Sequence, residues 1–220
     1  MLNFVVSSFY ANFVAMKTAQ NNPVKLSENI IIADADYADR VAFDLIVNFE
    51  RMLDRRIPQA DLSQWLVDVA LDGGLKPGEH ETQVVLLHGK NTAKLENFSP
   101  SDYDADLHGK AFKDDSLGEF VINALPVEPF TTKQDMLLDM MKTVLEHPEA
   151  HRVMIVPNAE DDDTWNMLRR MLRDVDDDER HITLFAMQPM EGGNFKQQIL
   201  GYSLMNAMGI TQAEIDRKMK

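Results

Sequence analysis

Apolar positions in this chain alternate between short continuous runs and longer helical periods. Residues 29–33 hold three consecutive isoleucines and end at Asp34, which predicts a strand buried on both faces. Similar runs predict four more strands, at 83–87, 119–125, 152–156 and 181–187. Apolar side chains at helical spacing predict helices over 41–53, 62–70, 137–145, 163–175 and 195–208. Thr211 and Glu214 predict a capping box at the start of a short final helix.

This alternation of strands and helices is typical of an α/β domain with right-handed crossovers. We therefore expect a three-layer α/β fold, Rossmann-like or PIN-like, with helices on both faces of a mostly parallel sheet of about five strands. The strand at 119–125 is the candidate antiparallel edge of that sheet.

Two segments do not fit the alternation. Residues 91–116 are polar and rich in aspartate, so we expect an irregular insertion or a functional lid there. Residues 1–26 form an N-terminal extension that is either disordered or an over-extended start, with Met16 as the true first residue. The alternative is that residues 1–15 form a hydrophobic arm that docks on a partner. Residues 27–220 are then expected to form a single α/β domain.

Cysteine content and charge narrow the classes of function. The 220 residues include no cysteine, which excludes disulfides and thiolate metal sites and favours a cytoplasmic location. The formal net charge of -14 repels nucleic acid and anionic membranes at long range. No apolar run reaches the roughly 20 residues that span a bilayer. We expect a protein partner or a homo-oligomer, no membrane, and nucleic acid only through a metal ion or a local basic patch.

Acidic side chains follow the predicted strands, at the edge where ligands bind in open α/β sheets. Several carboxylates at one edge favour Mg²⁺ or Mn²⁺ as a cofactor. The competing interpretation is that these residues only stabilise the N-termini of helices, where backbone N–H groups lack partners. The metal-ligand candidates are Asp34, Asp36, Asp161 and Asp162, and the catalytic candidates are Asp34, Asp135, Asp139 and Asp161.

Three segments together resemble the PIN/NYN-like ribonucleases: Ile-Ala-Asp-Ala-Asp at 32–36, Lys-Gln-Asp-Met-Leu-Leu-Asp at 133–139 and Ala-Glu-Asp-Asp-Asp-Thr-Trp at 159–165. In that family the first strand ends in an aspartate, a following helix carries another, and a later strand ends in a short acidic run. The resemblance implies metal ligands at Asp34 and at Asp161 or Asp162, and a ligand or water-orienting group at Asp135 or Asp139. At positions 35 and 36 the chain departs from the family's Gly-Asn.

Two further features are candidates for binding anions. Arg40 is the candidate phosphate contact, because it lies close in sequence to the first acidic strand end. Gly192, Gly193 and Asn194 form a loop that is predicted to open a helix, whose free backbone N–H groups would bind a phosphate. The competing interpretation of this loop is a tight turn.

A second resemblance covers most of residues 27–215. Its segments are 29–56, with Ala-Asp-Ala-Asp-Tyr-Ala-Asp-Arg-Val, then Ala-Leu-Asp-Gly-Gly-Leu at 70–75 and Phe-Ala-Met-Gln-Pro-Met at 185–190. They resemble an uncharacterised family of small α/β proteins from Bacteroidetes-type bacteria. That resemblance implies a bacterial origin and assigns no activity.

Two hypotheses of function follow. The first is a non-catalytic binding or assembly domain, which presents the 91–116 segment and the strand-end edge to a protein or a small ligand. The alternative is a divergent PIN/NYN-like, metal-dependent phosphodiesterase or ribonuclease that uses the strand-end carboxylates.

Overall fold

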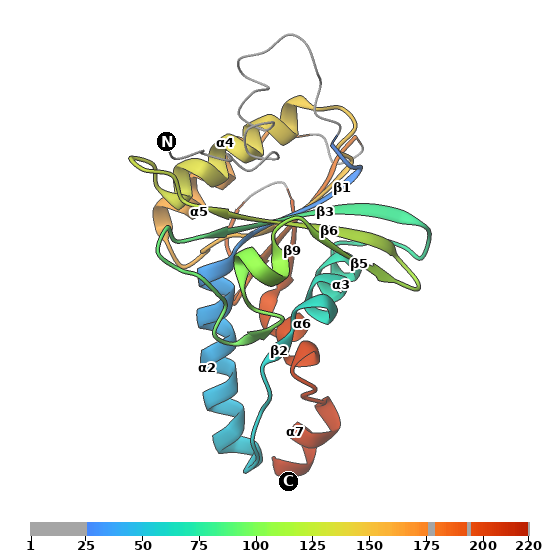
Figure 1. Ribbon diagram of the computed structural model, residues 1–220, viewed down its shortest axis with the longest axis vertical. Coiled ribbons are helices and arrows are strands. Elements are labelled where there is room, and N and C mark those ends of the chain that lie inside the picture. The colour runs from blue at the N-terminus through green and yellow to red at the C-terminus, as the bar shows by residue number, and fades with distance from the viewer. Residues whose placement is uncertain (1–25, 176–178, 193–194, 220) are drawn as a thin grey trace.

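The computed structural model describes residues 26–175, 179–192 and 195–219, and Figure 1 shows the arrangement of their elements. The proposed start at Met16 and the N-terminal arm lie outside these residues. Among the residues described, no helix is both long and apolar enough to cross a membrane. In chain order the elements are β1 (Asn29–Asp34), α2 (Ala35–Leu53), β2 (Ala60–Asp61), α3 (Leu62–Asp72), β3 (His80–His88), β4 (Phe98–Ser99), η1 (Tyr103–Leu107), β5 (Lys110–Asp114), β6 (Gly118–Pro126), α4 (Lys133–Glu146), β7 (Arg152–Val156), α5 (Asp162–Met171), β8 (His181–Ala186), β9 (Lys196–Ile199), α6 (Leu200–Ala207) and α7 (Gln212–Lys218).

The described residues form a seven-stranded sheet in the order β5-β6-β3-β1-β7-β8-β9, and β2 pairs with β4 in a separate two-stranded sheet. All neighbouring strands of the large sheet are parallel except β5, which runs antiparallel to β6. The prediction of a mostly parallel α/β sheet is therefore confirmed. β1 lies in the middle, pairs with β3 and β7, and has all six residues buried, as its isoleucine run predicts.

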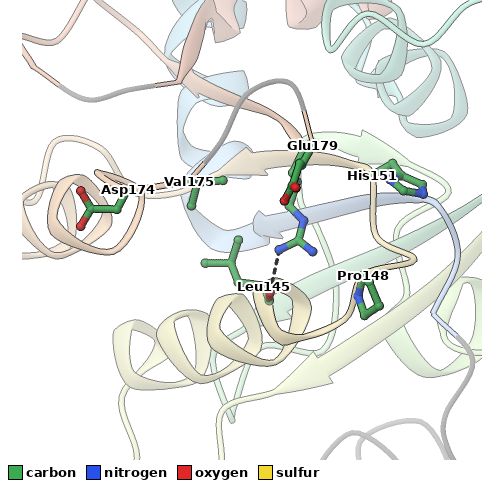
Figure 2. Close-up of a pocket in the computed structure, with 7 residues that line it drawn as sticks. Leu145, Pro148, His151, Asp174, Val175 and Glu179 are labelled. Carbon is green, nitrogen blue, oxygen red and sulfur yellow. Dashed lines mark hydrogen bonds between the residues drawn. The ribbon is translucent and has the colours of Figure 1, made fainter.

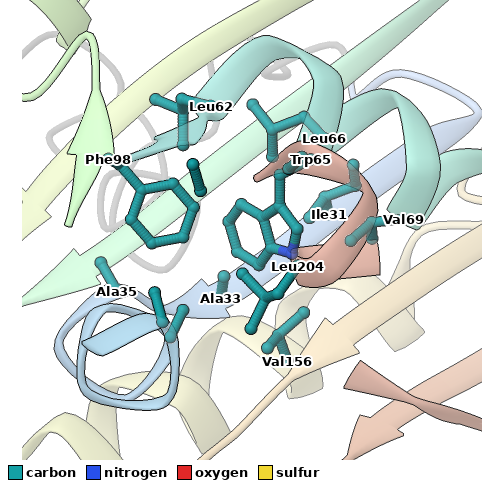
Figure 3. Close-up of a cluster of buried hydrophobic side chains, with 14 of the residues drawn as sticks. Ile31, Ala33, Ala35, Leu62, Trp65, Leu66, Val69, Phe98, Val156 and Leu204 are labelled. Atoms are coloured by element: carbon teal, nitrogen blue, oxygen red, sulfur yellow. The ribbon is translucent and has the colours of Figure 1, made fainter. Parts of the chain in front are cut away.

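Helices lie on both sides of this sheet, with α4 and α5 on one side and α2, α3 and α6 on the other (Figure 1). Alternate residues of β1 belong to two separate apolar clusters: Ile31 to the cluster shared with α2, α3 and α6, and Ile30 and Ile32 to the cluster with α4 and α5. In the first cluster Trp65 packs on Phe98, with 5.2 Å between ring centroids (Figure 3). Both faces of β1 are thus covered, which is why its four central residues, 30–33, are all apolar.

The sheet has two strands more than expected, and both lie at its edges. The strand predicted at 119–125 is not the edge: as β6 it pairs with β3 on one side and with β5 on the other. A tight turn brings β5 back along β6, because the Asp114 side chain accepts hydrogen bonds from the backbone N–H groups of Ser116 and Leu117 at 2.9 and 2.8 Å. At Gly118, where φ is +89°, an added Cβ would lie 2.2 Å from the His80 backbone oxygen.

The helix predicted over 195–208 is wrong in its first half. Residues Lys196–Ile199 form strand β9, which pairs with β8, and the helix α6 begins only at Leu200. Pairing with β8 satisfies backbone groups of this segment, so the tertiary contact overrides the local helical spacing. The side chain of Gln197 also bonds to the N–H and the carbonyl of Met190, at 2.9 and 2.8 Å, and so fixes the segment to the preceding loop. The helix predicted over 163–175 is shorter as well, since α5 ends at Met171.

The segment 91–116 is less irregular than expected. It holds β4, a single π-helical turn η1 and β5. Asp102 caps η1 by accepting from two backbone N–H groups. Four large apolar side chains of this segment are buried, namely Leu95, Phe98, Tyr103 and Leu107, and Phe112 is partly buried.

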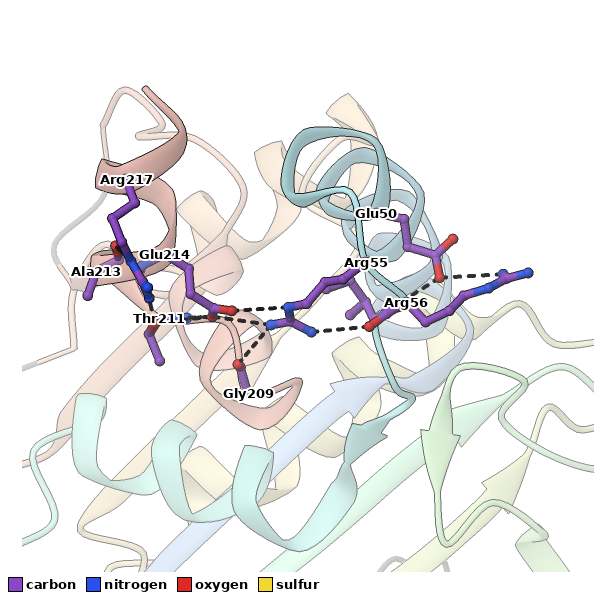
Figure 4. Close-up of polar contacts among 9 residues, drawn as sticks. Glu50, Arg55, Arg56, Gly209, Thr211, Ala213, Glu214 and Arg217 are labelled. Carbon is purple, nitrogen blue, oxygen red and sulfur yellow. Dashed lines mark hydrogen bonds and ion pairs between the residues drawn. The ribbon is translucent and has the colours of Figure 1, made fainter. Parts of the chain in front are cut away.

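The C-terminal helix α7 docks at the far end of α2, away from the sheet (Figure 1). Figure 4 shows the contact: Arg55 donates to both carboxylate oxygens of Glu214, at 3.0 and 3.2 Å, and to the carbonyl of Gly209. The predicted capping box of Thr211 and Glu214 is present. One arginine therefore joins the end of α2 to the start of α7.

Candidate functional site

The strand order of the large sheet reverses next to β1. From β1 the chain builds outward through β3 to β6, then returns to the other side of β1 and builds outward through β7 and β8. In open α/β sheets, ligands bind outside the carboxyl ends of the strands at such a switch point. Here that point lies between the ends of β1 and β7, at Asp34 and Val156.

Asp34 and Asp36 converge on one ammonium group at this point. The Nζ atom of Lys133 lies 2.6 Å from Oδ1 of Asp34 and 2.8 Å from Oδ2 of Asp36. Asp34 also caps α2 by accepting from the Tyr37 backbone N–H at 3.0 Å. Asp36 accepts from the Gly89 backbone N–H at 2.8 Å, which ties it to the end of β3. The two carboxylates are thus held by the first turn of α2, and Lys133 is held by both.

Lys133 is the first residue of α4, where its charge opposes the helix dipole. Only 29% of its side chain is exposed, and 11% of that of Asp34. Burial lowers the pKa of Lys133, but the adjacent carboxylates of Asp34 and Asp36 outweigh burial and leave that pKa raised. Lys133 is therefore a fixed cation at neutral pH, and its place is explained by the carboxylates and not by the helix.

A stacked pair of rings borders the carboxylates. The rings of His88 and Tyr103 lie 3.8 Å apart and nearly parallel, at 10°. Nδ1 of His88 lies 3.0 Å from the Gly89 carbonyl. Burial lowers the pKa of His88, so the ring is favoured in its neutral form. The pKa of Tyr103 is raised by burial first and then by the charge of Asp36.

A small cavity, the strand-end crevice, lies beside Lys133. Its lining residues are Asp34, Leu87, Lys133, Gln134, Leu137, Asn158 and Thr164. Its volume is about 20 Å³. A water molecule needs at least roughly 10–15 Å³ of such space, so the crevice has room for about one water-sized group. In this form the site does not take a nucleotide or another ligand of that size.

The other predicted carboxylates have local partners of their own. Asp135 forms a capping box with Thr132, and Asp139 lies near Lys142, with 3.5 Å between charged atoms and more than half of each side chain exposed. Asp161 caps α5 by accepting from Thr164, and Asp162 is the first residue of that helix. The capping interactions that compete with the metal interpretation are thus present at Asp135 and Asp161.

The predicted anion contacts lie elsewhere. Arg40 pairs with Glu160 at 3.1 Å in an exposed ion pair, and its guanidinium lies 5.3 Å from the centroid of the Tyr37 ring. Gly192 has φ at +80° and precedes strand β9, not the helix that the sequence predicted. Gly193 and Asn194 lie outside the described residues.

The implied Mg²⁺ or Mn²⁺ site does not fit the residues as placed. Across residues 26–175, 179–192 and 195–219, no group of three or more His, Cys, Asp or Glu side chains could hold a metal ion. Asp34 and Asp36 do meet, but the ammonium of Lys133 lies where a cation shared by them would bind. The metal and catalytic assignments therefore remain predictions without a supporting cluster.

The family comparison matches residues 23–215 to DUF6621, a family of unknown function. The chain belongs to this family. The expectation of an uncharacterised family is confirmed to that extent. No curated protein and no solved structure matches the chain. The site must therefore be interpreted from its own geometry.

At the opposite, amino ends of the strands, a cavity of about 700 Å³ lies between the ends of α4 and α5. Figure 2 shows Leu145, His151 and Glu179 around it. Beside it the guanidinium of Arg180 donates to the carbonyls of Leu145, His147 and Ala150, at 2.7 to 2.8 Å. Because residues 176–178 lie outside the described chain, this cavity supports no ligand assignment.

Lys133, His88 and Tyr103 were not predicted as parts of the strand-end site. One signal was present for Lys133: a basic residue directly after the N-cap Thr132 is unfavourable for a helix. A residue that opposes its own helix indicates a partner outside the helix. Nothing comparable in the sequence marks His88 and Tyr103, because their stacking depends on the path of the 91–116 segment.

Proposed function

We propose that this chain is a non-catalytic binding or assembly domain with a Rossmann-like arrangement, which uses its strand-end edge for binding. One observation carries the proposal: the ammonium of Lys133 lies between Asp34 and Asp36. The cation that these carboxylates require is thus supplied by the chain itself. A metal-dependent active site would instead need those oxygens for the metal ion.

The loop between β6 and α4, at the same edge, supports a role in binding. Phe130 is fully exposed there and adopts a left-handed backbone conformation, with φ at +68°. For an aromatic residue this conformation is strained, and such strain clusters at functional sites. An exposed aromatic ring three residues before Lys133 is a suitable contact for a protein partner or for a second copy of the chain.

A divergent PIN/NYN-like metal-dependent phosphodiesterase is the second candidate. It is favoured by the convergence of two strand-end carboxylates on one cation at the switch point of the sheet. In that case Lys133 would have to leave the carboxylates before a metal ion binds.

Thermal melts in Mg²⁺ and Mn²⁺ separate the two candidates. For the binding domain, we expect no change in the melting temperature of the wild type or of Asp34→Ala at millimolar metal. Lys133→Ala is expected to gain a metal-dependent rise, because it leaves two converging carboxylates without their cation. A rise of several degrees in the wild type that Asp34→Ala lacks would overturn the proposal in favour of the phosphodiesterase.

Sedimentation of the wild type over a range of concentrations then tests self-assembly directly. A concentration-dependent dimer that Phe130→Ser weakens would make the β6–α4 loop part of the interface between copies. A monomer at all concentrations would leave a different protein or a small ligand as the partner.

A further inference from the structure

We infer that the strand-end crevice contains a subsite for a single hydroxyl group, and that its ligand is a molecule that carries an alcohol hydroxyl. This inference rests on the proposed binding function and names the chemistry of its ligand. It is carried by the hydrogen-bonding groups that line the crevice and by the volume of the crevice.

Two residues of the crevice wall each carry a buried polar atom that lacks a partner. The amide nitrogen Nε2 of Gln134 and the amide oxygen Oδ1 of Asn158 are buried, and neither has a hydrogen-bond partner among the described residues. Both residues line the same cavity of about 20 Å³. A buried polar group left unpaired costs about 1–3 kcal/mol, so most such groups in folded proteins are satisfied. A small polar group in the crevice that reaches both atoms would satisfy them together.

The two atoms define the chemistry of that group. With the side-chain amides oriented as in the structure, it accepts a hydrogen bond from Gln134 and donates one to Asn158. Lys133 adds a further donor, since its bonds to Asp34 and Asp36 use two of the three N–H groups of its ammonium.

Only a group that both donates and accepts through one heavy atom meets these conditions, and that is a hydroxyl group or water. A carbonyl oxygen or a chloride ion accepts only, and would leave Asn158 unpaired. An alkylammonium group or a metal ion cannot accept from Gln134, and the charge of Lys133 repels both. The volume independently restricts the guest to about one heavy atom.

The position of the crevice favours a ligand hydroxyl over a permanent structural water. The crevice lies at the carboxyl ends of the strands, where the strand order reverses and where ligands of open α/β sheets bind. We expect a water molecule to take this place in the free protein. A ligand hydroxyl can displace that water with little loss, because it reproduces the same two hydrogen bonds.

Nuclear magnetic resonance of the full chain, labelled with ¹⁵N, tests the subsite. The probe is D-ribose, and 1,2-dimethoxyethane, which accepts but cannot donate, is the control ligand. We expect ribose to shift the side-chain amide signals of Gln134 and Asn158 in a saturable way below ~100 mM, where millimolar affinity saturates. Gln134→Met, which keeps the length but removes the amide, is expected to weaken this binding at least about tenfold, the effect of roughly 1.4 kcal/mol. Gln212→Met, on the exposed face of α7, is the matched variant and should bind as the wild type does.

Each other outcome overturns the inference. No saturable response to ribose, or an equal response to the control ligand, rejects a hydroxyl subsite. A long-lived water that gives a nuclear Overhauser effect to the Gln134 amide, without any ribose response, makes the crevice a structural water site only. Ribose binding that survives in Gln134→Met places the site elsewhere. The metal-dependent melts judge the proposed function separately, so a failure of one is not a failure of the other.

Discussion

A basic side chain contacts each end of helix α4, but the two side chains bind different kinds of acceptor. At the C-terminal end, Arg180 donates three hydrogen bonds to carbonyls of Leu145, His147 and Ala150. At the N-terminal end, Lys133 donates to the carboxylates of Asp34 and Asp36. A cation stabilises the C-terminus of a helix, whose carbonyls lack partners, and destabilises the N-terminus.

The difference distinguishes a residue placed for stability from one placed for a site. Arg180 donates to carbonyls at and just beyond the C-terminus of α4, one of which, that of His147, also accepts from the Ala150 backbone N–H at 3.2 Å. Its planar fork suits several acceptors at once. Lys133 opposes the dipole of its own helix, and two residues of the nearby crevice wall each carry a buried polar atom that lacks a partner. The C-terminal end of α4 is thus explained by folding alone, whereas the N-terminal end is not.

The largest expected loss of stability comes from removing the contacts at the C-terminal end of α4. Arg180→Ala removes three charge-assisted hydrogen bonds from carbonyls, and we expect it to lower the free energy of unfolding by about 2–4 kcal/mol. Urea denaturation measures this loss. Arg173→Ala, at an exposed position near the end of α5, is the control and should change the free energy by less than ~0.5 kcal/mol. An equally small effect of Arg180→Ala would show that water replaces the guanidinium at these carbonyls.

Lys133→Met is expected to cost less, about 1 kcal/mol. The variant loses two bonds to carboxylates, but it also removes a cation from a helix N-terminus, which returns roughly 0.3–1 kcal/mol. The measurement is again urea denaturation, with Lys142→Met on the same helix as the control for an exposed pair. A cost as large as that of Arg180→Ala would make Lys133 an ordinary structural contact and remove the argument for a site.

Much of this architecture follows from local sequence. The buried run of β1 predicted a central strand, and the parallel α/β arrangement predicted that Asp34 lies at the ligand-binding edge. The capping box of Thr211 and Glu214 was also predictable, because it involves four consecutive residues. Each of these features depends on periodicity or on groups a few residues apart.

The remaining features depend on contacts between residues far apart in sequence. Lys133 lies 99 residues from Asp34 and 97 from Asp36, and no local pattern records their pairing. Strand β9 was predicted as helix because its pairing with β8 is a tertiary contact. Asp135 and Asp139 were candidates for a site, but Asp135 forms the cap of α4 and Asp139 lies near Lys142.

The strand-end site is expected to make the melting temperature depend on pH through His88. Burial lowers the pKa of His88 from its ordinary value of 6.5, so folding favours the neutral ring. Its contribution to stability is present above the unfolded-state pKa, and it is lost as pH falls from 6.5 through the lowered folded-state pKa. We therefore expect a modest fall in melting temperature between about pH 7 and pH 5, which His88→Gln reduces. Equal curves for the two proteins would place the acid sensitivity in other residues.

The smallest expected effect concerns Asp72, the last residue of helix α3. Like Lys133, it carries a charge that opposes the dipole of its own helix. Its negative charge opposes the dipole at a C-terminus, and it has no ion pair among the described residues. Asp72 is exposed at the surface, but partial desolvation of its carboxyl, followed by the charge of Asp68 one turn earlier, raises its pKa above 3.8. The charged form is therefore disfavoured in the folded state at neutral pH, and the penalty disappears as pH falls below 3.8. We expect Asp72→Asn to raise the melting temperature by roughly 1–2 °C near pH 7 and not at all near pH 3, with the exposed Asp44→Asn unchanged at both. A loss of stability in Asp72→Asn would mean that the Asp72 carboxylate is stabilised by a partner. A charge that opposes its helix dipole would then not distinguish Lys133 as part of a binding site.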